Sequence, residues 1–470
     1  MTARRAPAVV SLAALAACTV GPNYRRPDIP VPPAFSELGA GAPASQADLS
    51  RWWLQFHDPV LQSLIERALA NNLDLEAAAS RIRQARFEER VAKAEQWPTV
   101  NAIGNALTLN SDRSSGGAPA QGLEIPGHLN LYAAGFDATW EIDLFGGVRR
   151  QIEEAKANGE AAVWAHRDSQ VTLTAEVAAD YLTLREVQTR LEIGEAELAR
   201  QKDIGGLIAS RHQAGFVTNL DVNQQTGATT AAAAQLHQLE AEERTQIHAI
   251  AVLLGEAPET LEPTLARGAA QAAPPPELPP GLPSELLQRR PDIREAERKL
   301  AAANAEIGVQ TANLYPKLNL IGLASFAAPT LGNLFSSQSF SSAGVGMVTA
   351  PLFTAGKTRA RINEAREQAA QAGIAYRSAI LGALRDTEDA LARYRSEEAR
   401  SVQLAQAVSA AENSLTIAKD QYSVGLVTFL NVYTAENTLL SARDQLAQSD
   451  AEAAEDLVSL YKALGGGWTT

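Results

Sequence analysis

The sequence predicts a mixed α and β protein made of two copies of one unit, each with a helix, two strands and a long helical hairpin. Motifs from the first half of the chain return in the second half in the same order. One stretch alternates strictly between apolar and polar residues, which is the period of a strand. No proline stands between Pro126 and Pro258, or after Pro351. Such stretches are typical of long helices, because proline removes a helical hydrogen bond.

Composition limits the classes of function. The chain has 470 residues, 46% hydrophobic and 20% charged, which is enough to bury a large core. Its 41 basic and 54 acidic residues give a net charge of -13. This balance predicts no nucleic acid partner, because phosphate binding depends on basic patches. A single cysteine excludes an internal disulfide and a cysteine-based metal cluster, and we expect no cofactor.

The N-terminus has the features of a secretory signal peptide over residues 1–17. Two arginines precede an uncharged run that is too short to span a bilayer. The run ends in Leu15-Ala16-Ala17-Cys18, which resembles a bacterial lipobox and predicts lipidation of Cys18. Thr19 follows, and not the aspartate that retains many enterobacterial lipoproteins at the inner membrane, so we expect attachment to outer-membrane lipid. The alternative is a buried cysteine that happens to follow a signal peptide.

The repeat has a period of roughly 210 residues. The sequence Trp-Pro-Thr-Val-Asn at 97–101 returns as Tyr-Pro-Lys-Leu-Asn at 315–319, and 215–222 returns at 425–432. We therefore expect a lipidated N-terminal segment at 18–58, a first repeat at 59–273 and a second repeat at 284–470. Between the repeats, residues 274–283 are proline-rich and predict a stiff connector.

In each copy a helix comes first, over about 71–96 and 292–314, and a proline ends it. Strands follow. The clearest has an apolar face and an acidic or hydroxyl face, made respectively by Phe136, Ala138, Trp140, Ile142 and Leu144 and by Asp137, Thr139, Glu141 and Asp143. The apolar face would meet a second sheet in a soluble sandwich or lipid in an outer-membrane barrel, and the pattern favours the barrel. Since the smallest outer-membrane barrels have eight strands, four strands per chain would require oligomerisation.

The long helices form hairpins with heptad spacing. On one arm the apolar residues are Leu404, Val408, Ala411, Leu415, Ala418 and Tyr422, and on the other they are Val432, Ala435, Leu439, Ala442 and Leu446. This spacing predicts coiled-coil packing around a turn that contains Gly425. An arm from Gly356 to Tyr422 would be about 100 Å long.

With these features the chain resembles an outer membrane factor of the TolC and OprM type, or a NodT-type outer membrane lipoprotein. Such proteins are the exit ducts of tripartite efflux pumps. The resemblance is carried by the repeat and by residues 18–27, 140–146 (Trp-Glu-Ile-Asp-Leu-Phe-Gly) and 282–293, and it covers essentially the whole mature chain. It implies a homotrimer in which a 12-stranded outer-membrane β-barrel, with four strands per chain, continues into a long α-helical periplasmic tunnel. It also implies a periplasmic adaptor (membrane fusion protein) and an inner-membrane pump of the RND type as partners. The duct would conduct drugs or other small molecules passively.

The resemblance also implies two sites on the helical hairpins. The family's hairpin tips carry a Val-Gly-Leu-x-Thr pattern that meets the adaptor. Val424, Gly425, Leu426, Val427 and Thr428 fit it fully. The first tip, Ala214 followed by Gly215, Phe216, Val217 and Thr218, fits it with Ala for Val and Phe for Leu. The simpler interpretation is that each glycine only permits a tight turn.

The second implied site is a periplasmic gate. Tyr422 matches the family's gate tyrosine, but Asn431 and Thr434 occupy the positions of the gate carboxylates. This departure predicts hydrogen-bonded or apolar closure by Tyr422, Leu430, Asn431 and Thr434 in place of a ring of aspartates. Helix packing is the alternative role for Tyr422.

The sequence offers no convincing motif of an enzyme. Ala355-Gly356-Lys357-Thr358 imitates the end of a phosphate-binding loop, but Pro351 occupies the position of its first glycine. The six histidines show no metal-ligand spacing. We therefore expect no enzyme activity. The competing hypothesis is a lipid-anchored periplasmic coiled-coil scaffold, which would explain the helices but not the strand from Phe136 to Leu144.

Overall fold

The computed structural model describes residues 19–37, 49–110, 128–265 and 289–468. The predicted signal peptide, Cys18 and the connector at 274–283 lie outside these residues. The chain divides into two compact units. The sheet unit comprises Met1–Asp28, Ile82–Ala162 and Ala296–Tyr376, and the hairpin unit comprises Ile29–Arg81, Val163–Glu295 and Arg377–Thr470.

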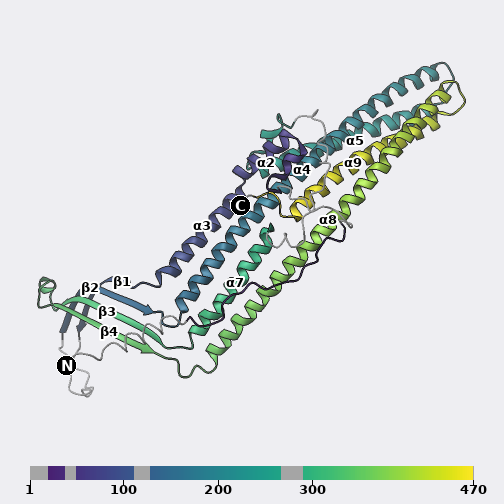
Figure 1. Ribbon diagram of the computed structural model, residues 1–470. Helices are drawn as coiled ribbons and strands as arrows, with labels where there is room; N and C mark the ends of the chain where they lie inside the picture. The colour runs from purple at the N-terminus through teal and green to yellow at the C-terminus, as the bar shows by residue number, and fades with distance from the viewer. Residues whose placement is uncertain (1–18, 38–48, 111–127, 266–288, 469–470) are drawn as a thin grey trace. The chain divides into compact units, whose positions relative to one another are not determined.

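The sheet unit contains four antiparallel strands in the order β1-β2-β3-β4 (Figure 1). Their bounds are Thr99–Asn110 for β1, His128–Ile142 for β2, Lys317–Ala328 for β3 and Phe340–Thr349 for β4, with the short helix η3 (Leu331–Asn333) between β3 and β4. Two strands per repeat are therefore confirmed. Strand β2 is shorter than expected, since it ends at Ile142 and not at Leu144.

Pairing shows how the two faces of the sheet are composed. Phe136 pairs with Ala324 and Trp140 with Leu320, so these side chains share one face, which we call the Trp140 face. Asp137 pairs with Leu323 on the opposite face, the Asp137 face. The predicted separation of apolar and acidic residues holds along β2 from 136 to 142, but it does not extend over the whole sheet, because β3 places leucine opposite aspartate.

Helices α3 (Leu73–Ala94) and α7 (Pro291–Ala312) precede β1 and β3. Each ends before a proline, at Pro98 and Pro316, which confirms the predicted stops within about two residues. In the sheet unit α7 packs against α4 (Gly147–Gln213) through small residues, with Ala157, Ala301 and Ala302 in one buried cluster. Small side chains allow such close approach of two helices.

The hairpins are formed by α4 with α5 (Asn219–Leu253) and by α8 (Lys357–Ser423) with α9 (Phe429–Ala463). Both long arms contain 67 residues and both short arms contain 35. The two hairpins therefore have arms of the same lengths, and a 67-residue helix is about 100 Å long. The predicted heptad contacts are also present, since Leu415, Tyr422, Val432 and Leu439 are buried in one cluster.

Away from the turns of the hairpins, the hairpin helices pack against a segment that precedes α3. It contains η1 (Leu49–Phe56) and α2 (Pro59–Asn71), and η2 (Pro258–Leu261) follows α5. Trp52 is fully buried and stacks on Tyr461 with ring centroids 5.0 Å apart. Asp58 caps α2 by accepting from the amides of Val60 and Leu61, and it also accepts from the Tyr181 hydroxyl at 2.6 Å.

None of the helices that the structure describes combines the length and the apolar composition of a membrane span.

Candidate functional site

The first hairpin tip joins α4 to α5 through Ala214–Thr218, and its geometry is set by glycine and threonine. The Phe216 amide donates to the Arg211 carbonyl and the Gly215 amide to the His212 carbonyl, each at 2.9 Å, which closes the end of α4. Gly215 has a φ of 80°, in the left-handed region. Thr218 then caps α5 in a full capping box, because its amide donates to Asp221 and its hydroxyl oxygen accepts from the Asp221 amide.

The second tip repeats this geometry with one change. Gly425 has a φ of 79°, and the Leu426 amide donates to the Gln421 carbonyl at 2.9 Å. Thr428 is again the residue before the next helix, but its side chain accepts no backbone amide. Its hydroxyl instead donates to the Asn431 side-chain oxygen at 3.0 Å. The second tip therefore lacks the capping box of the first.

Both tips expose apolar side chains at their ends. Phe216 is 81% exposed and Leu426 74% exposed, although both are large apolar residues. Val424 and Leu430 are also exposed. By contrast, Val217 and Val427 are half-buried against the core between the hairpins. The tip motif thus divides into residues that hold the turn and residues that face outward.

Tyr422 lies in the core behind the second tip. It is 9% exposed, and its ring meets Phe429 at a centroid distance of 6.1 Å. The guanidinium of Arg211, on the neighbouring hairpin, lies 4.7 Å from the centre of the Tyr422 ring. The Tyr422 hydroxyl is buried without a hydrogen-bond partner among the described residues. Within one chain Tyr422 therefore packs the two hairpins together, and its hydroxyl is left unused.

The other predicted gate residues lie on the first two turns of α9 and form local hydrogen bonds. Thr434 donates to the Leu430 carbonyl at 2.8 Å, and Asn431 accepts from Thr428. All three remain accessible, with Leu430 56% exposed. The structure brings Tyr422, Leu430, Asn431 and Thr434 to one end of the hairpin unit, but it does not join the four side chains to one another.

A buried polar layer, which the sequence analysis missed, connects the four hairpin helices. Gln201 on α4 donates to Glu197 at 2.6 Å and to Glu436 on α9 at 3.0 Å, while Gln225 on α5 donates to the Gln201 carbonyl at 2.6 Å. Lys419 on α8 lies 3.3 Å from Glu436. Burial, followed by the nearby Glu197 charge, raises the pKa of Glu436. The heptad pattern did not indicate this layer, because Glu436 lies next to the predicted apolar position Ala435 and is not one of those positions.

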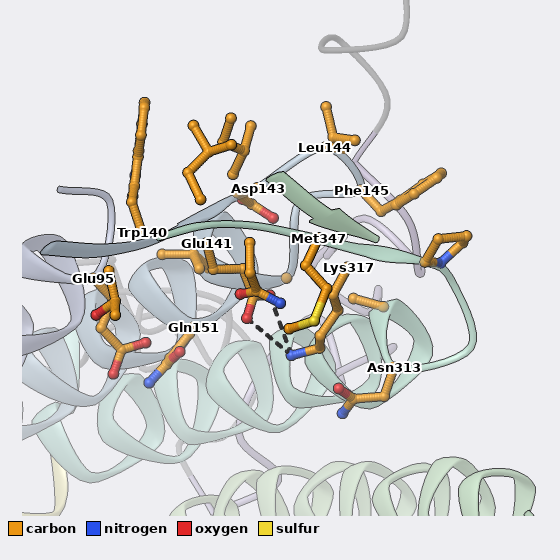
Figure 2. A pocket seen from close by; sticks show the side chains of 18 of the residues that line it. Glu95, Trp140, Glu141, Asp143, Leu144, Phe145, Gln151, Asn313, Lys317 and Met347 are labelled. Carbon is orange, nitrogen blue, oxygen red and sulfur yellow. Dashed lines mark hydrogen bonds and ion pairs between the residues drawn. The ribbon is translucent and has the colours of Figure 1, made fainter. Parts of the chain in front are cut away.

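The junction between strands and helices in the sheet unit contains a cavity of about 460 Å³ (Figure 2). Lys317 lies 3.1 Å from Glu141, across the β2–β3 pair. Figure 2 shows both on one side of the sheet and Trp140 on the other. The Trp140 indole donates to the Gln96 carbonyl at 2.9 Å, which ties the end of α3 to β2.

The segment that follows Cys18 is held firmly against this junction. The Val20 amide donates to the Phe145 carbonyl at 3.0 Å. Arg150, only 3% exposed, donates to the carbonyls of Val20 and Gly21 and to the Asn23 side chain. The chain next to the predicted lipid attachment point is thus fixed close to the end of β2, although Cys18 itself is not described.

Among the described residues no group of three histidine, cysteine or carboxylate side chains is arranged to hold a metal ion.

Comparison with known proteins gives one consistent result. The family model for outer membrane efflux proteins matches residues 64–256 and 282–466. The chain is 31% identical over 460 residues to the probable efflux pump outer membrane protein TtgC of Pseudomonas putida, covering 97% of this chain and 93% of the relative. It is 32% identical over 454 residues to the pyoverdine export outer membrane protein OpmQ of Pseudomonas aeruginosa, covering 97% and 95%. The solved outer-membrane channel OprN matches with a TM-score of 0.86 and 35% identity, over 96% of this chain and all of that one.

Proposed function

This chain belongs to the outer membrane efflux protein family, and from that membership we propose how it works. It is the outer-membrane exit duct of an efflux system, and it has the fold of the trimeric channels of the TolC and OprM type. Four strands per chain supply one third of a 12-stranded barrel, and the helical hairpins continue it into the periplasm. We propose that the duct is passive and catalyses no reaction of its own. The described sheet has no role in a coiled-coil scaffold, so we set that alternative aside.

We propose that the two hairpin tips dock a periplasmic adaptor. The observation that carries this proposal is the outward exposure of Phe216 and Leu426 beside two turns that are otherwise held by hydrogen bonds. Binding is favourable when a partner buries a large apolar side chain, and a turn that is already rigid loses little conformational entropy on binding. An adaptor with an apolar groove at its own helical tip would fit both positions.

We further propose that the adaptor links this duct to an inner-membrane pump of the RND type, and that Cys18 carries a lipid in the outer membrane. The fixed position of residues 20–23 beside β2 supports the proposal of a lipid on Cys18, because it holds the neighbouring part of the chain close to the sheet.

Site-specific photocrosslinking tests the docking proposal. A photoreactive residue at position 426 or 216 should cross-link to the adaptor in living cells. The matched control is position 381 on α8, where Leu381 is also exposed but lies many helical turns before the tip. Equal cross-linking from position 381 would contradict docking at the tips.

A further inference from the structure

The Asp137 face of the sheet combines charged and apolar residues in a way that bears on cargo. The three antiparallel pairings run without interruption from end to end, so each side chain keeps its face along the whole strand. The four strands contain three charged residues, and all three lie on this face: Asp137, Glu141 and Lys317. Charges on the lipid face of a barrel are costly, so this face lines the water-filled lumen.

The same face also carries large apolar side chains. On β3 and β4, Ile321 pairs with Val345 and Asn319 pairs with Met347, while Leu323 pairs with Asp137 on β2. The apolar side chains remain partly exposed, since Ile321 is 38%, Leu323 39% and Val345 56% exposed. Further along β1 and β2, Leu107 pairs with Leu131 on this face. An apolar stripe therefore runs beside a polar stripe inside each third of the barrel.

The charge on this face is not balanced. Glu141 is paired with Lys317 at 3.1 Å. Among the described residues the Asp137 carboxylate accepts from the Asn101 side-chain amide at 3.2 Å and has no basic partner, so two acids against one base leave one negative charge on the strands of each chain. That negative charge lies on the register row of Leu323. A carboxylate beside an apolar stripe matches a molecule with a cationic group and an apolar body.

We propose that this lumenal face is a track for amphiphilic cations, with the apolar body against Ile321, Leu323, Val345 and Met347 and the charge near Asp137. The proposal rests on the function as an exit duct and adds a class of cargo to it. Contact of this kind is weak and repeated, as conduction requires, because a tightly held cargo would not leave.

The test is block of ionic current through the purified trimer in a planar lipid bilayer. Octyltrimethylammonium, added from the barrel side, should reduce the current at about one tenth of the concentration that octanesulfonate or tetramethylammonium requires, a ratio equivalent to about 1.4 kcal/mol. Asp137→Asn and Leu323→Ser should each raise the half-blocking concentration about threefold to tenfold. The control Ala324→Ser, on the Trp140 face, should leave it unchanged. Equal block by the ammonium and the sulfonate, or an equal effect of Ala324→Ser, would overturn the proposal.

Cysteine labelling tests the assignment of the face independently. The sequence contains no cysteine other than Cys18, so Leu323→Cys and Ala324→Cys introduce single probes once Cys18 is acylated or replaced by serine. A charged, membrane-impermeant methanethiosulfonate should reduce the current through the Leu323→Cys trimer and spare the Ala324→Cys trimer. The reverse result would show that the lumen lies on the other face. Loss of export in cells with normal cation block would instead count against the pairing with a pump.

Discussion

At the residue scale, the helix caps at the two tips differ because the first uses the carboxylate of Asp221 and the second the amide of Asn431. Asp221 accepts both the amide and the hydroxyl of Thr218, whereas Asn431 only accepts the hydroxyl of Thr428. A complete capping box satisfies amides that are otherwise unpaired at a helix start. The first turn of α9 is therefore held less firmly than that of α5.

Asn431→Asp should complete the missing capping box. We expect the backbone amides of the first turn of α9 to exchange with deuterium about threefold to tenfold more slowly, since a cap contributes on the order of 1 kcal/mol. Hydrogen exchange measured by mass spectrometry checks this. The matched change in the first tip, Asp221→Asn, should accelerate exchange at the start of α5. Unchanged exchange in both variants would show that the caps do not limit fraying.

Tyr422→Phe separates packing from gating. The hydroxyl has no hydrogen-bond partner in the part of the chain that the structure describes, so its removal should change the free energy of unfolding by less than about 1 kcal/mol. Tyr422→Ala should cost about 3 to 5 kcal/mol by leaving a cavity. If the hydroxyl closes the gate by bonding to another copy, Tyr422→Phe should raise the conductance of the isolated trimer. Unaltered conductance together with unaltered stability would assign Tyr422 to helix packing alone.

The Glu154–Glu306 pair predicts a dependence of stability on pH. Burial, and then the Glu306 charge, raises the pKa of Glu154 from its ordinary 4.5 to about 7. Because the folded-state pKa is the higher one, the stabilising contribution is complete below pH 4.5 and is lost as the pH rises through 7. Glu154→Gln should therefore raise the melting temperature at pH 8, by about 2 °C or less, and have little effect at pH 4. A similar effect at both values would exclude titration of this carboxyl as the cause.

At the element scale, periodicity in the sequence was enough for the helices but not for the sheet. Heptad spacing and the absence of proline predicted the helical hairpins, and Gly425 indicated the position of the turn. Strand β1 has little alternation, and the faces of β3 become visible only when Asp137 is paired with Leu323. Pairing depends on distant segments, so no local pattern encodes it. The buried polar layer could not be predicted for the same reason. Gln201, Gln225 and Glu436 are distant in the sequence and become partners only when the hairpins pack together.

The two faces of β2 should differ in their tolerance of charge. Phe136 lies near the middle of the strand on the Trp140 face, so Phe136→Lys should destabilise the inserted trimer by about 2 to 4 kcal/mol. Trp140→Lys and Ile142→Lys, near the strand end, should cost less. Thr139→Lys, on the Asp137 face, should be tolerated best. Urea unfolding in lipid vesicles, or heat-modifiable migration on gels, measures this order. Equal tolerance on both faces would contradict the barrel orientation.

At the scale of the whole molecule, the two repeats are joined so that the hairpins respond together. The core behind the tips takes Ile208 from α4, Leu415 from α8 and Val432 from α9. The buried polar layer links α4, α5 and α9 through Gln201, and Lys419 joins α8 to it through Glu436. Broken hydrogen bonds in a buried layer are costly, so one hairpin does not slide past the other without a compensating gain. A bound partner can supply that gain only if it prefers one arrangement over the other.

Leu426→Asp should therefore abolish export while leaving assembly intact. Leu426 follows Tyr422 by four residues, in the turn after α8 ends at Ser423, and Arg211 on the other hairpin covers the Tyr422 ring. An adaptor that buries Leu426 would act directly on the contacts that hold Tyr422, so docking and opening would be one coupled equilibrium. An aspartate at this exposed position removes the apolar contact without disturbing the core, and the trimer should still form and insert. Accumulation of a fluorescent pump substrate measures export, adaptor cross-linking measures docking, and Phe216→Asp supplies the equivalent change in the first tip. If Leu426→Asp keeps normal export and cross-linking, the tip is only a turn, and opening must be driven from elsewhere on the duct.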